Sequence, residues 1–366
     1  MITCIRGPLI AGMGLVLAAC SPAEQPVVHV YNWSDYIAED VIERFEERTG
    51  IHVVYDVYDG NEILEAKLLA GRSGYDVIFP TAHPFGERHI QAGLYRPLDF
   101  SFLPHRENLD PVLVDKLDTV DPGNRYTVPY MWGTTGVGYN IDRVTEILGE
   151  DAALDTWALL FDPEIAEQLS DCGIAVLDDE GEALAAALLY LGLDPNSTNP
   201  EDIESATDAF MQVRPHIRYF HASKYINDLA NGDLCVAHGY SGDVIQARDR
   251  ADEAGTGINI DYRIPSEGAV LWFDLMAIPA DAPNPEHAHA FIDFLMVAKN
   301  IAEITNEVAY ANANAAATAW VDATIRYDPG VYPTRELRER LVTLDSLPDE
   351  VQRARVRAWT RIKTGH

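Results

Sequence analysis

Apolar, β-prone runs alternate with amphipathic segments near the start of the chain. Runs rich in valine, isoleucine and tyrosine predict strands at Val27–Trp33, Ile51–Val57 and Tyr75–Phe79. Between them, apolar residues at helical spacing predict helices at Ile37–Arg48 and Asn61–Ala70, each ended by a nearby glycine. This order of elements predicts a parallel, doubly wound α/β sheet, in which ligands bind at the carboxyl ends of the strands.

The middle of the chain has a different pattern. Pro129–Asn140 is rich in glycine and threonine and has no helical period, so we interpret it as a crossing segment between two lobes. Two α/β lobes joined by crossing strands are the simplest architecture for 366 residues. Further strands are predicted at Ile174–Leu177, Leu234–Ala237, Ile258–Ile264 and Val270–Ile278. Further helices are predicted at Glu182–Leu191, Glu201–Val213, Lys224–Asn231, Asp243–Ala254, Glu286–Met296 and Asn300–Val308.

Residues 1–19 have the pattern of an export signal. Arg6 precedes an apolar stretch that is shorter than the roughly 20 residues of a membrane span. The stretch ends in Leu-Ala-Ala-Cys, which resembles the cleavage site of bacterial lipoproteins. We therefore expect 1–19 to be a lipoprotein signal peptide, Cys20 to be lipidated, and 20–26 to be a short tether. The alternative is an ordinary signal peptide cut nearby, with Cys20 incidental.

Two cysteines remain after the leader and Cys20 are set aside. Cys172 and Cys235 are expected to form a disulfide, because disulfides persist in exported proteins. The alternative is two buried thiols. A metal site is not expected, since the chain has no Cys-x-x-Cys or His-x-x-x-His spacing and its eleven histidines are scattered. No cofactor is expected either.

The charge balance narrows the choice of partner. The chain has 58 acidic and 27 basic residues, and its formal net charge is −31. Nucleic acid and anionic lipid surfaces require a basic face, so both are excluded as partners, whereas cationic ligands remain open. Solubility explains most of the charge, because net charge affects association more than fold.

Several carboxylates lie beside aromatic residues at predicted strand ends. Asp274 is inside an apolar strand, where a carboxylate is costly unless it is paired or hydrogen-bonded. Asp243 and Glu182 have simpler explanations, as a helix N-cap and as an acid that favours a helix dipole. Asp35 is the fourth carboxylate, and the aromatic residues near these acids are Trp33, Tyr36, Tyr240, Trp272 and Tyr310.

Aromatic faces combined with carboxylates suit an organic cation. Cation–π attraction contributes about 0.5–2 kcal/mol per contact, and carboxylates add charge-assisted hydrogen bonds. The same residue types suit a glycosidase, whose two carboxylates flank a sugar. The chain has no Gly-x-Ser-x-Gly, Walker loop or zinc-helix motif, so we predict a binding protein and no enzyme. The alternative, an exported hydrolase, predicts a carboxylate with a raised pKa.

Longer stretches of the chain resemble a known family. Val30–Ile37, Pro129–Gly136, Ile217–His221 and Tyr310–Asn314 are similar to segments of the polyamine-binding receptors of bacterial ABC importers, which are extracellular solute-binding proteins. The likeness covers nearly the whole mature chain, and it looks closest to the putrescine-binding periplasmic proteins. It also supports a disulfide between the two remaining cysteines.

The resemblance implies the two-lobed periplasmic-binding-protein clamshell of type II, with crossing hinge strands. Lobe 1 would comprise 27–135 plus about 275–336, and lobe 2 would comprise about 139–269 plus 342–366. The family's ligand contacts would fall on Trp33, Ser34, Asp35, Tyr36, Thr81, Phe85, Glu182, Tyr240, Asp243, Trp272, Asp274 and Tyr310.

In this family layout each kind of residue has a role. Asp243 and Asp274 neutralise one ammonium, and Ser34, Asp35 and Glu182 meet the other amines. The aromatic residues sandwich the methylene chain between them.

Three positions depart from the putrescine receptors and bear on specificity. Tyr240 stands where those receptors usually have Trp, and Trp272 stands where they have Phe. Asp179 is an acid where they have a small residue. Since Asp179 and Trp272 resemble spermidine receptors, we include Asp179 as a contact for a third amine. The alternative is that Asp179 is a solvated loop acid.

The predicted function is that of the substrate-binding receptor of a polyamine ABC importer, which captures putrescine and/or spermidine and delivers it to a membrane permease. The alternative is a polyamine sensor that feeds a chemoreceptor or a signalling kinase. The sequence does not separate the two, because the outer surface decides the partner. We expect a periplasmic monomer that is tethered to the membrane through Cys20.

Overall fold

The computed structural model describes residues 25–366 of the chain. The predicted signal peptide at 1–19, the predicted lipidation site Cys20 and most of the predicted tether lie outside the described residues. No helix within 25–366 is long and apolar enough to cross a membrane. The same residues contain no group of three or more His, Cys, Asp or Glu side chains that could hold a metal ion.

The predicted alternation of strands and helices begins the fold. β1 (Val27–Trp33) and α2 (Asn61–Ala70) have the predicted bounds. The ends of α1 (Glu39–Thr49) and β2 (His52–Tyr58) differ slightly from the prediction. β3 is shorter than predicted and spans only Val77–Ile78, because only these two residues pair with β1. The three strands are parallel, as the order of elements predicts.

The rest of the chain contains every other predicted strand and helix, with modest differences at the ends. The predicted strands are β5 (Ile174–Val176), β7 (Val236–Tyr240), β8 (Ile260–Arg263) and β9 (Ala269–Ala277), and β4 (Thr127–Asn140) contains the predicted crossing segment. The strands that were not predicted are β6 (Ile217–Phe220), β10 (Ala311–Asn312) and β11 (Leu341–Val342). The predicted helices are α8 (Glu180–Tyr190), α9 (Pro200–Val213), α10 (Tyr225–Ala230), α11 (Ser241–Glu253), α12 (Pro285–Leu295) and α13 (Ala298–Val308). The helices that were not predicted are α3 (Glu87–Gln91), α4 (Pro111–Lys116), α5 (Ile141–Leu148), α6 (Ala158–Phe161), α7 (Pro163–Leu169), α14 (Ala323–Arg326), α15 (Arg335–Arg338) and α16 (Asp349–Thr364).

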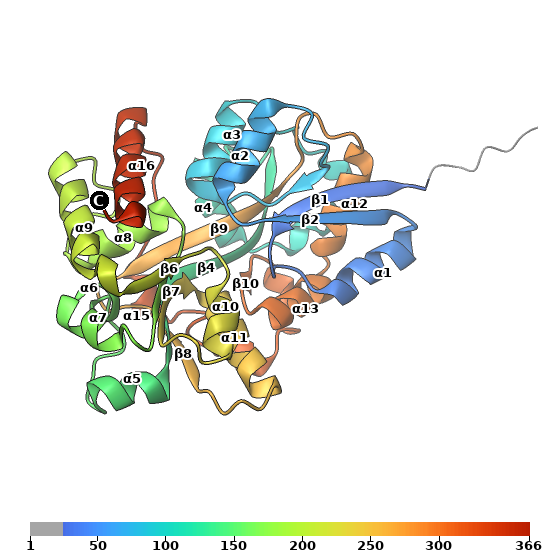
Figure 1. Ribbon diagram of the computed structural model, residues 1–366. Coiled ribbons are helices and arrows are strands. Elements are labelled where there is room, and N and C mark those ends of the chain that lie inside the picture. The colour runs from blue at the N-terminus through green and yellow to red at the C-terminus, as the bar shows by residue number, and fades with distance from the viewer. Residues whose placement is uncertain (1–24) are drawn as a thin grey trace, which may run out of the picture.

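Two long strands connect the halves of one mixed sheet, whose order is β2-β1-β3-β9-β4-β7-β5-β6. β4, which contains the predicted crossing segment, pairs antiparallel with β9 over most of the length of β9. Figure 1 shows both strands passing through the middle of the molecule. All 14 residues of β4 are buried. The crossing strands that the sequence predicts are therefore confirmed.

The two halves of the sheet have separate hydrophobic cores. The half with β1, β2 and β3 packs around Phe45 and Phe291. The half with β5, β6 and β7 packs around Trp157 and Phe210. Figure 1 shows α1, α2 and α12 beside the first half, and α8 and α9 beside the second. The predicted two-lobed α/β fold is confirmed, while the exact division of the chain between lobes stays a prediction.

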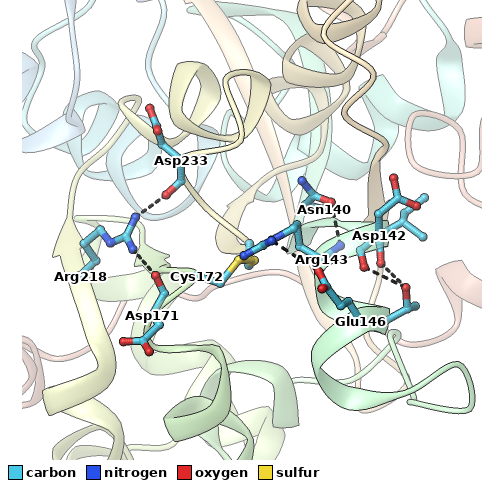
Figure 2. The surroundings of a disulfide bond; sticks show 11 residues. Asn140, Asp142, Arg143, Glu146, Asp171, Cys172, Arg218 and Asp233 are labelled. Atoms are coloured by element: carbon cyan, nitrogen blue, oxygen red, sulfur yellow. Dashed lines mark hydrogen bonds and ion pairs between the residues drawn. A yellow bond between two sulfur atoms is a disulfide. The ribbon is translucent and has the colours of Figure 1, made fainter.

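A disulfide joins Cys172, after α7, to Cys235, before β7, with Cα atoms 5.4 Å apart. The predicted pairing is therefore confirmed. Arg218 of β6 lies beside this bond (Figure 2). Its guanidinium donates to the backbone carbonyls of Asp171 and Asp233. The same two segments are thus joined by a covalent bond and by a bridging side chain.

Candidate functional site

A cavity of about 1050 Å³, part of it open to solvent, lies between the two halves of the sheet. The carboxyl ends of β1, β3, β5 and β7 lead into it, as expected for ligand sites of parallel α/β sheets. All but one of the predicted ligand contacts line this cavity: Trp33, Ser34, Tyr36, Thr81, Phe85, Asp179, Glu182, Tyr240, Asp243, Trp272, Asp274 and Tyr310.

Aromatic rings form a connected wall of the cavity. The ring of Trp272 meets those of Tyr240 and Tyr310 edge-on, with centroids 5.7 and 5.3 Å apart. Tyr36 approaches Tyr310 in the same way, at 5.1 Å. A Cβ atom on Gly242 would lie 2.6 Å from the Tyr310 ring, so this close approach requires glycine. The resulting wall offers π faces to a cation and apolar surface to an alkyl chain.

The half of the molecule that contains β1 contributes Trp33 and Ser34. The indole Nε1 of Trp33 donates to the carbonyl oxygen of Phe79 at 2.8 Å, which fixes the ring at the end of β1. The hydroxyl of Ser34 donates to Asp59 at 2.9 Å. Both side chains are therefore oriented by bonds within this half, before any ligand contact is considered.

Asp243 is the buried third residue of α11. Its two carboxylate oxygens accept hydrogen bonds from the phenols of Tyr225 and Tyr310, each at 2.6 Å. The interpretation of Asp243 as a helix N-cap is wrong, because Tyr240 occupies the N-cap position. Burial raises the pKa of Asp243 to about 6, although both phenols favour the ionised form.

Asp274 lies inside β9 and is buried, as the sequence indicates. Its carboxylate accepts a hydrogen bond from the Thr81 hydroxyl at 2.7 Å. Thr81 is in turn held by the side chain of Asn61, which donates to its hydroxyl oxygen at 3.1 Å. Burial raises the pKa of Asp274 to about 7, and the Thr81 hydrogen bond opposes this rise only in part.

Asp179 and Glu182 lie at the start of α8. Asp179 is the N-cap of this helix, since its carboxylate accepts from the backbone N–H of Glu182 at 3.0 Å. Glu182 is buried, and its Oε2 has no hydrogen-bond partner among the residues that the structure describes. Burial, and then the charge of Asp179, raise the pKa of Glu182 well above its usual value. Asp179 is therefore a structural cap as well as a lining residue.

Asp35 is the one predicted contact that the structure does not bring into the cavity lining. It occupies a left-handed backbone conformation, with φ of 52°, in the turn after β1. Its carboxylate forms an ion pair with Arg250 of α11, with an oxygen–nitrogen distance of 2.7 Å. Asp35 lies between Ser34 and Tyr36 in the sequence, and both of these neighbours line the cavity. The left-handed turn at Asp35 directs its own side chain to Arg250 instead.

The cavity also contains residues that the sequence analysis missed. Glu62 had a usable signal, since it lies in the first turn of a helix that follows a strand end. Gln352 and Arg355 had no such signal, because α16 is distant in the sequence and reaches the cavity by packing against α8 and α9. The missed lining residues include Asp59, Glu62, His83, Arg88, Glu180, Asp345, Gln352 and Arg355.

The lining carries a large excess of negative charge. Its two arginines are engaged elsewhere: Arg88 pairs with Glu65 at 2.9 Å, and Arg355 donates to the carbonyl of Pro195 at 2.5 Å. A flexible apolar chain with several positive charges fits such surroundings. The lining carboxylates are Asp59, Glu62, Asp179, Glu180, Glu182, Asp243, Asp274 and Asp345.

Raised carboxylate pKa values are what the hydrolase alternative predicts. At Asp243 and at Asp274, however, burial is the largest cause of the rise. Burial acts on any carboxylate in apolar surroundings, whether it binds or catalyses. The raised pKa values therefore do not favour an enzyme.

Two lobes joined by crossing strands, with an acidic and aromatic cavity between them, define a solute-binding protein of the clamshell class. The chain belongs to the family of bacterial extracellular solute-binding proteins, whose sequence profile matches residues 40–332. This family and the relatives described next are solute-binding proteins and not enzymes.

The relatives are similar over almost their whole length. The putrescine-binding periplasmic protein SpuD of Pseudomonas aeruginosa is 51% identical over 352 residues, which cover 96% of each chain. The putrescine-binding periplasmic protein PotF of Escherichia coli is 51% identical over 344 residues, covering 94% of this chain and 93% of PotF. A solved structure of a putative spermidine/putrescine ABC transporter protein from Listeria monocytogenes is 31% identical. It superimposes with a TM-score of 0.82 over 93% of this chain and 99% of its own.

Proposed function

We propose that this protein is the substrate-binding receptor of a polyamine ABC importer. It captures putrescine and/or spermidine between its lobes and delivers it to a permease in the membrane. The observation that carries this proposal is the arrangement of two buried carboxylates, Asp243 and Asp274, around a wall that contains Trp272 and Tyr310. Relatives of 51% identity that are named as putrescine-binding proteins support it.

The ligand acts by joining the two lobes. Trp33 and Ser34 come from the half with β1, whereas Glu182 and Asp243 come from elements that pack on the half with β5 and β7. A ligand shifts an open–closed equilibrium only by the difference in its contacts with the two states. A diamine that touches both sides makes more contacts when the lobes are closed, so it favours the form that the permease receives.

The buried carboxylates also explain the preference for a cation. Burial raises the pKa of each carboxylate, so ionising Asp243 or Asp274 is costly in the protein without ligand. An ammonium group between them would supply the missing charge and donate hydrogen bonds. The apolar faces of Trp272 and Tyr310 would cover the methylene groups of the ligand.

Titration calorimetry tests the proposal on purified protein that has been unfolded, dialysed and refolded to remove any bound amine. Putrescine, cadaverine, spermidine, spermine and agmatine are titrated in turn. We expect at least one to bind with micromolar or tighter affinity, which is about −8 kcal/mol. Folded protein that gives no heat with any of the five would contradict the ligand assignment.

We further propose that the protein works as a monomer in the periplasm and is held at the membrane by a lipid on Cys20. The test is fractionation of cells that express the unmodified protein or Cys20→Ser. The unmodified protein should sediment with membranes. A Cys20→Ser protein that fractionates in the same way would contradict the tether and leave the ligand assignment untouched.

A further inference from the structure

The cavity continues beyond the carboxylates already described, toward α16. The charges that act on Asp243 are those of Asp35 and Arg250. Those that act on Glu180 are Arg355, Asp179 and Glu62. The two carboxylates therefore have different charged neighbours although they line one cavity. We call the second region, formed by Glu62, Asp179 and Glu180, the outer acidic end.

Glu180 is the best-defined member of the outer acidic end. Only 8% of its surface is exposed. Its Oε2 accepts a hydrogen bond from Gln352 Nε2 of α16 at 2.7 Å, which fixes the side chain. Its Oε1 has no hydrogen-bond partner within residues 25–366, although the residue lines the cavity. A buried, oriented carboxylate oxygen without a partner is a group that a ligand can satisfy.

The nearby cations compensate the charge of this carboxylate only in part. Arg355 is close enough to lower the pKa of Glu180, but the two form no ion pair, and Arg355 Nη2 donates to Pro195 instead. Arg88 is held by Glu65. Burial outweighs the influence of Arg355 and raises the pKa of Glu180 to about 7. A positive group of the ligand would offset this cost.

Glu62 contributes a second carboxylate from the other side of the cavity. It belongs to α2, which packs against β2, whereas Glu180 belongs to α8, which packs against α9. The charge of Asp179 raises the pKa of both glutamates, and the charge of Glu62 also raises the pKa of Glu180. A cation between them would therefore touch both lobes.

We propose that Glu180, together with Glu62, is a second cation subsite that takes the terminal ammonium of a linear triamine. The other amines of the same ligand lie at Asp243 and Asp274. This inference rests on the proposed function and deepens it, because Glu180 and Glu62 then determine whether a triamine is preferred to a diamine. A diamine pairs with Asp243 and Asp274 and makes no contact with the outer acidic end.

The test compares putrescine with spermidine in calorimetry on the unmodified protein, Glu180→Gln, and Glu62→Gln/Glu180→Gln. Glutamine keeps the shape and removes the charge. We expect the double variant to lose about tenfold or more in spermidine affinity and less than about twofold in putrescine affinity. Glu47→Gln on the exposed face of α1 removes a charge outside the cavity and is the matched control.

A ligand-side measurement keeps the test independent of folding. Both monoacetylated spermidines lack one terminal charge, so they should bind the unmodified protein more weakly than spermidine. Of the two monoacetylated spermidines, the one that binds more tightly should have almost the same affinity for the double variant as spermidine has. The proposal is overturned if the unmodified protein prefers putrescine, or if spermidine affinity in the double variant matches that of Glu47→Gln. If the unmodified protein bound neither putrescine nor spermidine, the proposed function itself would be rejected.

Discussion

The carboxylate of Asp35 and the guanidinium of Arg250 form an ion pair of 2.7 Å that joins the turn after β1 to α11. These two elements pack on different halves of the molecule, so the pair connects the lobes away from the cavity lining. The side chains are 40% and 34% exposed, and water therefore screens the pair. Its expected contribution to closure is small.

Mutation of the ion pair separates its linking role from ligand contact. Arg250→Ala and Asp35→Asn should each weaken putrescine binding by less than about fivefold, because an exposed ion pair contributes at most about 1 kcal/mol. The loss should shrink at high salt. Calorimetry at two salt concentrations measures both effects. If Asp35→Asn alone lost far more affinity than Arg250→Ala, Asp35 would be a direct contact after all.

Asp243→Asn should weaken polyamine binding by about 10- to 100-fold, since it removes a charged hydrogen-bond acceptor from the cavity. The fold should persist, because asparagine keeps the shape and burial already disfavours the charge of Asp243. Calorimetry and thermal unfolding measure the two effects. Asp252→Asn, on the same helix and outside the lining, is the control. An unchanged dissociation constant for Asp243→Asn would defeat its assignment to the site.

Lowering the pH from 7.5 to 5.5 should stabilise the ligand-free protein. The folded-state pKa values of Asp243 and Asp274, about 6 and about 7, lie above the ordinary aspartate value of 3.8. The native state therefore binds protons that the unfolded state releases, and this stability is lost as pH rises through 6 and 7. Asp243 and Asp274 together should contribute about 2–3 kcal/mol to this gain, which is seen as a higher melting temperature.

The same pH change should weaken ligand binding by about tenfold, because an ammonium group requires the carboxylates to be ionised. Calorimetry at both pH values measures this change. The opposite signs of the two trends are the diagnostic feature. A melting temperature and an affinity that fell together would show that acid unfolding, and not titration of the cavity, dominates this range.

Removing the disulfide should cost about 2–4 kcal/mol of unfolding free energy, since the bond closes a loop between residues 63 positions apart. Urea unfolding of Cys172→Ser/Cys235→Ser measures the loss. The variant should still bind putrescine, because Arg218 also joins the segments around the bond and neither cysteine lines the cavity. Loss of binding at low urea, with the secondary structure intact, would contradict this separation.

The elements and site residues that could be predicted from the sequence are those that depend on neighbouring residues alone. β1 and α2 follow from residue type and spacing alone, and the rule for strand ends places Trp33 and Thr81 at the site. Glu180 could not be foreseen as a buried group, because α8 packs against α16, a helix far along the chain that also supplies its hydrogen-bond partner Gln352. The place of Asp35 outside the lining could not be predicted either, because its left-handed backbone conformation is not revealed by neighbouring residue types. Its predicted contact with the ligand stays a prediction.

The alternative explanation of Asp243 as a helix N-cap failed for a related reason. An acid just after a strand-to-helix turn is typical of an N-cap. Here the helix begins two residues earlier, at Ser241, so Asp243 lies inside its first turn. Its partners, Tyr225 and Tyr310, come from other elements. The type of residue was informative about chemistry, whereas its position relative to the helix end required the tertiary structure.

β4 and β9 have a mechanical consequence. Each is a central strand of the sheet and is shared by both halves, so separating the halves would break the ladder between β4 and β9. Although each half of the sheet packs around its own hydrophobic core, the molecule is expected to unfold in one cooperative transition. Because both lobes share these two strands, neither lobe is expected to fold when it is expressed alone.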